Sequence, residues 1–527
     1  MPGLEIPLFV KNMGHEIIGF ILNLSDKESK SIIDGSLAPN EIQHQILVGY
    51  INICRQLRIQ AIDLGDVDFA LFNFLPHLLQ NNRHVFNLWH EQMGGQRVEI
   101  DEPDKVVYLL SKLALEIYPL FLIRATPSSR MFKQTSVYLM PILSRLPDHN
   151  LLLKEIQSDM SLSKMFSKID ASEIETIIQF SASTGRGSRL ELNRIPAGMI
   201  TNAYELMRLR GEFSKTALIS AIKEVTEILR SAAEGKLVQV PVFLGFHNVG
   251  LKKDTIIETA WGFIRSYHEG FLDLIPPEAK PQLGGEHQIL GFVFESRYPY
   301  KVKFNINDIG DWPSELTQAR GNLEKLQEDL SLAIALSIER DPPVGITPSW
   351  TLVVDPISPE TSISWRNHPM SPMPPYLCNE EDYSVIKNWC TTINKTEDRK
   401  IRIAIRRVLS SINEKINPID GFVDSVIAWE NLFGGKPETA FRISMSIARL
   451  LETTIEKKLE LQKRINNYYN DRSKIVHGDK EITYEEAVEK RNECLKITLK
   501  CLRELYQKRS ELLSYAAADR SKRLLLQ

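Results

Sequence analysis

Two residues near the C-terminal end of the chain, Arg472 and His477, carry side chains suited to cutting RNA without a metal ion. An arginine stays cationic at physiological pH, and its planar fork of donors matches a phosphate. A histidine can give or take a proton near neutral pH. The pair lies in the run Tyr469-Asn470-Asp471-Arg472-Ser473-Lys474-Ile475-Val476-His477-Gly478. No other motif in the chain makes so specific a chemical suggestion.

The spacing of the pair limits how one copy can work. Residues five apart on a straight α-helix point about 140° away from each other. Arg472 and His477 therefore cannot share one helical face unless the helix loosens. Gly478 is the natural residue to end a helix directly after His477. We expect one copy of the motif to supply half of a site.

The elements that must position the pair form a predicted helical bundle. Phe422, Val426, Trp429 and Phe433 make one apolar stripe. Gly434-Gly435 stops that helix, Pro437 suits the first turn of the next, and Thr483 begins a capping box with Glu486. The predicted helices are Asp382–Thr392, Glu397–Asn413, Ile419–Phe433, Pro437–Asn470 and Thr483–Leu513.

This C-terminal region resembles the HEPN superfamily of α-helical bundles, and its Apea-like branch in particular. The run from Arg472 to His477 fits the family motif of an arginine, a polar residue, three to five residues and a histidine. The helix 424–433 fits the upstream pattern D-x-x-(I/A)-x-x-E-x-L-F of that branch, and Arg442 with 448–451 fits its R-x-A-x-L-L helix. The resemblance covers roughly residues 380–515.

The resemblance implies a metal-independent endoribonuclease without a cofactor. HEPN domains typically dimerise, so that two motifs face each other across one composite site. His477 would act as general acid or base while the RNA 2′-OH attacks the neighbouring phosphate. Arg472 would stabilise the charge on the phosphorane. The products would be a 2′,3′-cyclic phosphate and a 5′-OH, and DNA would not be cut.

Six further residues are candidates for supporting roles or for RNA contacts. The supporting candidates are Ser473, Glu430 and Asp424, and the RNA-binding candidates are Lys474, Lys480 and Tyr469. Four of these residues could also have a purely structural role. Glu430 either orients Arg472 or stabilises the bundle, the two lysines also suit a solvated face, and Tyr469 either stacks on a base or packs in the bundle. Ser473 stands where the wider superfamily often has Asn, Asp or His.

The rest of the chain divides into two predicted regions. Residues 1–235 read as a helical sensor or regulatory region, and residues 236–369 as a small α+β module. The helices predicted in the first region are His15–Leu24, Pro39–Leu57, Asp68–Gln80, Asp104–Ile123, Met131–Leu146, Ala171–Phe180, Ala197–Arg208 and Ser214–Ala233. The second region has predicted strands at Leu237–Phe246, Gln288–Glu295, Tyr300–Ile306 and Trp350–Val354, with a helix after Ser314.

Two shorter segments complete the division of the chain. The loop from Ser183 to Arg189 has two cations and free backbone. It lacks the ending of a P-loop, so a solvated linker is favoured over a phosphate contact. Residues 516–527 read as a tail.

Composition indicates an ordinary globular protein. The 527 residues carry a net charge of −3, so RNA binding must come from local patches. The five cysteines form no CxxC pair, which argues against a zinc ribbon or a disulfide framework. No signal peptide or apolar run long enough to span a membrane is visible. These features predict a cytoplasmic protein.

The sequence as a whole predicts a mainly α, multi-domain protein with an α+β module and a C-terminal HEPN bundle. By analogy with bacterial proteins of this architecture, the first 370 residues would restrain a toxin or anti-phage effector. A phage or cellular trigger would release it to cut tRNA or other RNA. Two alternatives stay open: a catalytically silent HEPN scaffold that binds a protein partner, and a nucleotide-sensing regulator.

Overall fold

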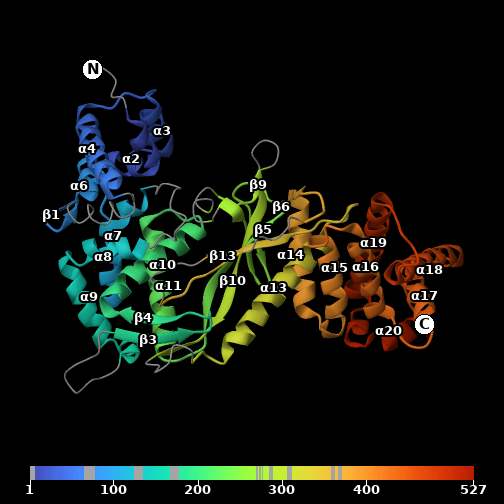
Figure 1. Cartoon of the computed structure of the whole chain (residues 1–527). Helices are drawn as coiled ribbons and strands as arrows, with labels where there is room; N and C mark the ends of the chain where they lie inside the picture. The colour runs from blue at the N-terminus through green and yellow to red at the C-terminus, as the bar shows by residue number, and fades with distance from the viewer. Residues whose placement is uncertain are drawn as a thin grey trace. The chain divides into compact units, whose positions relative to one another are not determined.

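The protein is mainly α-helical and also contains β-sheets, as the sequence predicts (Figure 1). This computed structural model describes residues 6–64, 78–123, 135–166, 177–268, 271, 275, 277–283, 289–304, 311–357, 363–365 and 371–526. In these ranges no helix is both long and apolar enough to cross a membrane.

The chain folds into two compact units. Unit 1 consists of Met1–Pro241, Tyr298–Ala319 and Val353–Ser362, and unit 2 of Val242–Arg297, Arg320–Leu352 and Ile363–Gln527. The chain thus enters each unit more than once. The division into 1–235, 236–369 and 380–515 stays a prediction.

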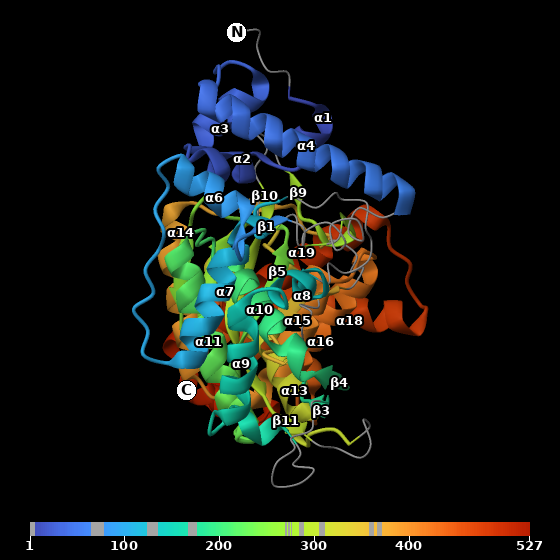
Figure 2. The same cartoon turned by 90° about the vertical axis from the view of Figure 1, so that its left-hand side faces the viewer.

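Unit 1 is built mostly from helices. They are α1 (Leu8–Asn12), α2 (His15–Leu22), α3 (Asp26–Asp34), α4 (Glu41–Leu64), α6 (Val85–Gln92), α7 (Lys105–Phe121), α8 (Thr135–Leu143), α9 (Pro147–Ser158), α10 (Ile195–Leu209) and α11 (Lys215–Ala233), with short 3-10 turns at Leu162–Met165 and Leu192–Arg194. Asp104, the first residue of the helix predicted here, caps α7, because its carboxylate accepts hydrogen bonds from two backbone amides of the first turn. Helices α7, α9, α10 and α11 lie side by side (Figure 2).

One predicted helix of unit 1 is a strand instead. The segment Ala171–Phe180 was expected to be helical, but Ile177–Ala182 forms β3, and 171–176 lie outside the described residues. Strand β3 pairs on one side with β4 (Gly187–Glu191) and on the other with β11 (Val302–Phe304). Pairing on both sides satisfies its backbone groups, which local sequence does not reveal. The predicted 183–189 linker is only in part a loop: it contains the turn of this hairpin, with Gly185 at φ 83°, and its residues 187–189 belong to β4.

The end of another predicted helix in unit 1 is also extended. Of the predicted helix Asp68–Gln80, residues 68–77 lie outside the described residues, and Leu79–Gln80 forms strand β1. It pairs with β2 (Arg83–His84) across Asn81 and Asn82, whose φ angles are 50° and 61°. Asparagine tolerates this left-handed conformation, which a tight hairpin requires.

Unit 2 combines a sheet with a helical bundle. Among the described strands, the order in the main sheet is β13-β12-β5-β10-β8-β7, and β9 pairs with β10. Strands β14 and β6 form a separate parallel pair. The bounds are β5 (Val238–His247), β6 (Val249–Gly250), β7 (Ile256–Thr259), β8 (Gly262–Ser266), β9 (Gln282–Leu283), β10 (Ile289–Tyr300), β12 (Thr347–Val353), β13 (Ile363–Trp365) and β14 (Tyr376–Leu377). Strands β5, β10 and β12 begin in one unit and end in the other.

The predicted strands of this region exist, but their pairing differs from the expectation. The segments 288–295 and 300–306 were expected to be joined by a short turn. Strand β10 instead runs on to Tyr300 and leaves no room for that turn. The following strand, β11, pairs with β3. Strands β7 and β8 were missed, because each is short and carries few apolar residues.

The bundle follows in α14 (Glu380–Lys395), α15 (Arg402–Asn413), α16 (Pro418–Phe433), α17 (Thr439–Leu451), α18 (Ile455–His477), α19 (Tyr484–Lys508) and α20 (Ala517–Leu526). Short 3-10 turns lie at Arg399–Ile401 and Ser510–Ser514. Helix α16 is central and packs against α15, α17, α18, α19 and α20. The predicted stripe lies in the core, where the Trp429 indole donates to the Thr498 hydroxyl at 2.7 Å.

Three expectations for the bundle were wrong in detail. The predicted helix Pro437–Asn470 is two helices, because the Thr454 side chain accepts a hydrogen bond from the Lys457 amide and starts a new one. Pro437 precedes α17 instead of opening it, since Glu438 has a left-handed backbone with φ 62°. The predicted 516–527 tail is helix α20, whose Arg520, Ser521 and Leu524 are buried.

Buried polar contacts tie the bundle to helix α13 (Glu315–Ser337) within unit 2. The Arg402 guanidinium pairs with Asp329 of α13 and with Asp398. The Arg503 guanidinium donates to backbone carbonyls at the C-terminal end of α13, including Leu336 at 2.9 Å. These carbonyls have no partner within the helix, and a cation there is also favoured by the helix dipole.

The Tyr506 hydroxyl completes this cluster by donating to Asp398 at 2.6 Å. Tyr506→Phe should lower the free energy of unfolding by about 1.5–3 kcal/mol, the range for a hydrogen bond to a charged group. Urea unfolding followed by tryptophan fluorescence measures the change. Tyr515→Phe, whose hydroxyl is not seen bonded in the described part of the chain, is the matched control. An equal loss in both variants would contradict the expectation.

Candidate active site

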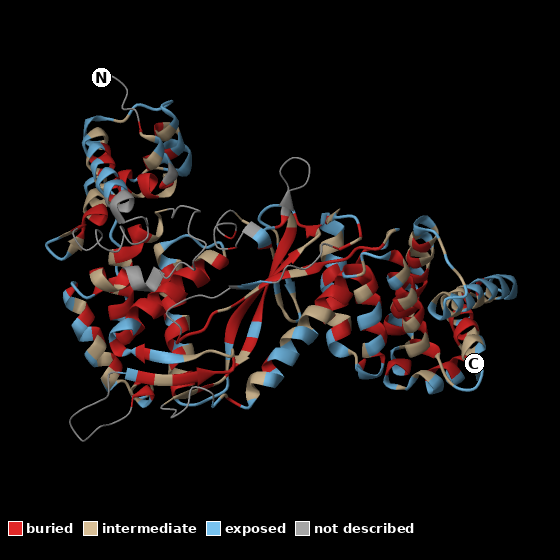
Figure 3. Cartoon of the chain, viewed as in Figure 1, coloured by how far each residue is buried: buried red, intermediate tan, exposed pale blue. Residues whose placement is uncertain are grey.

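Helix α18 carries the candidate motif at its C-terminal end. The helix ends at His477, and Gly478 follows with φ 79° as predicted. The Gly478 and Asp479 amides donate back to the carbonyls of Ile475 and Lys474. A side chain at Gly478 would be strained in this backbone conformation, so glycine fixes where the helix stops. Most of α18 is exposed, and its buried residues are Leu461 and Ile465 (Figure 3).

Arg472 lies against the bundle. Its Nη1 is 3.6 Å from Oε1 of Glu430 on α16, and its side chain is 21% exposed. That distance is too long for a hydrogen bond. Its Nε is buried and has no hydrogen-bond partner among the described residues. The guanidinium therefore keeps donor capacity that its surroundings do not use.

Tyr469 belongs to the same group. Burial raises the pKa of Tyr469, and so does the Glu430 carboxylate with which it is hydrogen bonded. Glu430 thus contacts both Arg472 and Tyr469. The neighbouring Tyr468 belongs to the core instead, with its ring near those of Phe422 and Trp429.

His477 is exposed at the end of the helix, and Ser473 is half-buried. Five helical residues separate His477 from Arg472, so the helix directs the two side chains about 140° apart. Arg472 faces Glu430, and His477 faces solvent. A single chain therefore presents the two groups on different sides of α18.

The predicted supporting residue Asp424 lies elsewhere. It is buried on α16, and its Oδ1 accepts from Arg407 at 2.9 Å. Its Oδ2 has no hydrogen-bond partner in the described ranges. The structure thus brings Glu430, Tyr469 and Arg472 together and leaves Asp424 outside that group.

The predicted RNA-binding lysines differ in availability. Lys474 is exposed, and none of the described residues forms an ion pair with it. Lys480 is held by Asp471 at 2.7 Å, so its charge is already paired. The Asp471 carboxylate also binds Lys490 of α19 at 2.7 Å. Sequence reasoning missed Asp471 and Lys490, although Asp471 stands directly before Arg472.

The Asp471 cluster fixes the loop between α18 and α19, and we expect its contribution to depend on pH. Burial opposes the charged carboxylate, but hydrogen bonds from Lys480 and Lys490 outweigh it and lower the pKa of Asp471 below 3.8. A lowered pKa in the folded state stabilises the fold above the unfolded pKa, and this stabilisation disappears as pH falls through the folded pKa.

Asp471→Asn should therefore cost about 1 kcal/mol of unfolding free energy at pH 7, and this cost should shrink as the pH falls below 3.8. Unfolding in urea at several pH values measures the difference from the wild type. Asp479→Asn, on the same loop and exposed, is the control. A penalty for Asp471→Asn that stays constant from pH 7 to pH 2.5 would contradict this assignment.

Comparison with known proteins gives no relative for this chain: no family model matches it, nor does any curated protein or solved structure.

In the described part of the chain, no group of three or more His, Cys, Asp and Glu side chains is arranged to hold a metal ion.

Proposed function

We propose that the protein is a metal-independent endoribonuclease of the HEPN type, with a composite site formed by two copies of the motif. The observation that carries the proposal is that the Arg472 guanidinium has a donor group without an acceptor among the described residues. Its guanidinium has a buried Nε without a partner in the described chain and one loose ion pair, and it precedes the exposed His477 at a glycine-capped helix end. A phosphate would supply the missing acceptors.

The chemistry follows from these two side chains. The RNA 2′-OH attacks the adjacent phosphorus, and the His477 imidazole of one copy accepts its proton. The P–O bond to the 5′ oxygen breaks, and the protonated His477 of the other copy donates a proton to that oxygen. Arg472 stabilises the charge on the phosphorane oxygens. The products are a 2′,3′-cyclic phosphate and a 5′-OH.

The arrangement on α18 supports a composite site. Because one helix turns Arg472 and His477 to different sides, a second copy is the simplest source of the missing group. We further propose that the protein is a regulated toxin or defence effector acting on tRNA or other cellular RNA, which rests on its architecture alone.

The test is cleavage of total tRNA in the presence of EDTA. The wild type should cut RNA and leave cyclic phosphate ends, while an oligonucleotide with a 2′-deoxy residue at the cut site should stay intact. The Arg472→Ala/His477→Ala double variant, purified in parallel, controls for contaminating ribonucleases. Absence of cleavage together with absence of toxicity on expression would favour a silent scaffold. Tight nucleotide binding without RNA turnover would favour a nucleotide-sensing regulator.

A further inference from the structure

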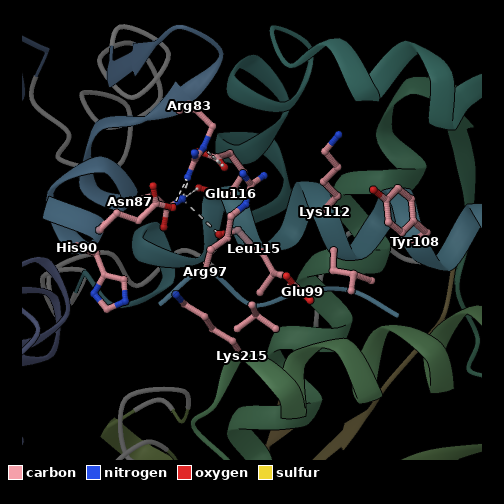
Figure 4. A pocket seen from close by; sticks show the side chains of 13 residues that line it. Arg83, Asn87, His90, Arg97, Glu99, Tyr108, Lys112, Leu115, Glu116 and Lys215 are labelled. Atoms are coloured by element: carbon pink, nitrogen blue, oxygen red, sulfur yellow. Dashed lines mark hydrogen bonds and ion pairs between the residues drawn. The ribbon is translucent and has the colours of Figure 1, made fainter. Parts of the chain in front are cut away.

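Unit 1 contains a cavity that the proposed ribonuclease chemistry does not use. Its volume is about 500 Å³, and it lies among α6, α7, the start of α11 and the segment 97–100 (Figure 4). This size falls within the range of small-molecule sites. All the side chains that line it belong to the described part of unit 1.

Two acidic residues of the lining share one arginine as their ion-pair partner. The Glu116 carboxylate accepts from Arg83 Nε at 2.9 Å and from the Asn87 amide at 3.2 Å. The Glu91 carboxylate accepts from Arg83 Nη2 at 2.7 Å. Arg83 thus pairs with both acids, and the dashed lines of Figure 4 mark the Arg83 and Asn87 contacts. One guanidinium against two carboxylates leaves this wall with one unit of negative charge.

The remaining lining has an excess of positive charge. Lys112 pairs with Asp148 at 2.9 Å, but Lys215 and Arg97 have no ion pair among the described residues. The nearest acceptor of the Lys215 ammonium is the Gln96 carbonyl at 3.5 Å. Opposing them is Glu99, which is exposed and keeps its hydration. Two unpaired cations therefore face one solvated acid.

Lys215 is the more constrained of the two cations. It is half-buried, and its ammonium lies 5.0 Å from the centre of the Phe20 ring. Burial lowers the pKa of Lys215, and the negative charges of Glu91 and Glu116 offset only part of this cost. Lys215 is also the first residue of α11, where the helix dipole favours an anion. A bound anion would offset the cost of burying this charge.

Apolar groups line the rest of the cavity. Tyr108 is 37% exposed, and Leu115 and Ile100, which also line the cavity, are half-buried. In Figure 4 the Tyr108 ring lies at one end of the row of side chains and His90 at the other, with Arg97 and Lys215 between them. We propose that this cavity binds a small organic anion, a phosphate or a carboxylate, that carries a planar apolar group. Lys215 and Arg97 bind the anion, and Tyr108 contacts the planar group.

Calorimetric titration of the full-length protein tests this site with three probes. AMP presents a phosphate on a planar group, salicylate presents a carboxylate on one, and inorganic phosphate lacks the planar group. At least one of AMP and salicylate should bind more tightly than inorganic phosphate, and the better of the two identifies the anion. Lys215→Gln should weaken that binding by at least tenfold, as expected for a charged hydrogen bond. Arg97→Gln should weaken it by about threefold, because Arg97 is exposed and its charge is screened by water.

Matched variants separate this site from a general effect of charge. Lys27→Gln and Arg189→Gln remove exposed cations of unit 1 outside the cavity and should bind as the wild type does. Lys215→Arg keeps the charge and should retain most of the affinity, which also serves if Lys215→Gln folds poorly. Failure of both AMP and salicylate to bind would overturn the proposal. So would equal losses in the cavity variants and their controls.

Discussion

Replacement of His477 by alanine is expected to lower the rate of RNA cleavage by about 10²–10⁴-fold, the range that general acid–base catalysis contributes. His477 is exposed at the end of α18, and its side chain forms no hydrogen bond or ion pair with the residues that the structure describes. The unfolding free energy should therefore change by less than about 0.5 kcal/mol. Single-turnover cleavage of a short RNA in EDTA, beside a thermal unfolding curve, measures both quantities.

The same assay distinguishes the role of Arg472. Arg472→Ala should lower the rate by about 10²–10³-fold, as the loss of one charge-stabilising group does elsewhere. Lys463→Ala removes an exposed cation from the same helix and should leave the rate unchanged. A composite site also predicts that specific activity falls on dilution of the protein. Full activity of either motif variant would contradict the assignment.

Arg520→Ala is the second large effect we expect, and it concerns stability. The side chain is fully buried, and burial lowers the pKa of Arg520 to about 10. Its guanidinium donates to three backbone carbonyls, those of Leu512 at 3.0 Å, Leu432 at 2.6 Å and Tyr515 at 2.6 Å. The substitution leaves these carbonyls without their donor and opens a void, which should cost about 3–5 kcal/mol.

Urea unfolding monitored by tryptophan fluorescence gives this cost. Lys522→Ala, on the exposed side of α20, should change stability by less than about 0.5 kcal/mol. Arg520→Lys should recover only part of the loss, because an ammonium cannot reach three carbonyls with a planar fork. A loss for Arg520→Ala no larger than for Lys522→Ala would show that α20 does not stabilise the bundle.

Local signals in the sequence predicted the parts of the fold that depend on local energetics. The Asp104 cap, the Gly478 helix end and the apolar stripe of α16 were all visible, because capping and helical periodicity act within a few residues. Strand β3 could not be recognised in this way. One of its two partners, β11, lies more than 100 residues away, and a local pattern does not show that pairing.

The candidate site likewise has residues that the sequence revealed and contacts that only the packing of the helices determines. Arg472 and His477 could be found from residue type and spacing. Glu430 was expected either to orient Arg472 or to stabilise the bundle, and its ion pair with Arg472 at 3.6 Å agrees with both roles. The pairing of Asp471 with Lys480 and Lys490 could not be read from the chain, because it depends on how α19 returns along α18. The pattern of the helix 424–433 made Asp424 a candidate supporting residue, but the packing of α16 against α15 pairs it with Arg407 instead.

The hydrogen bond from Arg520 to the Leu432 carbonyl has a consequence for the order of events during synthesis. Leu432 lies two residues from Glu430, at the end of α16, and Arg520 is made 88 residues later. Chains fold progressively from the N-terminus as they leave the ribosome. The helix end beside Glu430 therefore acquires this support only after the whole Arg472–His477 motif has been translated, so a chain not yet translated as far as Arg520 holds this part of the bundle unfinished.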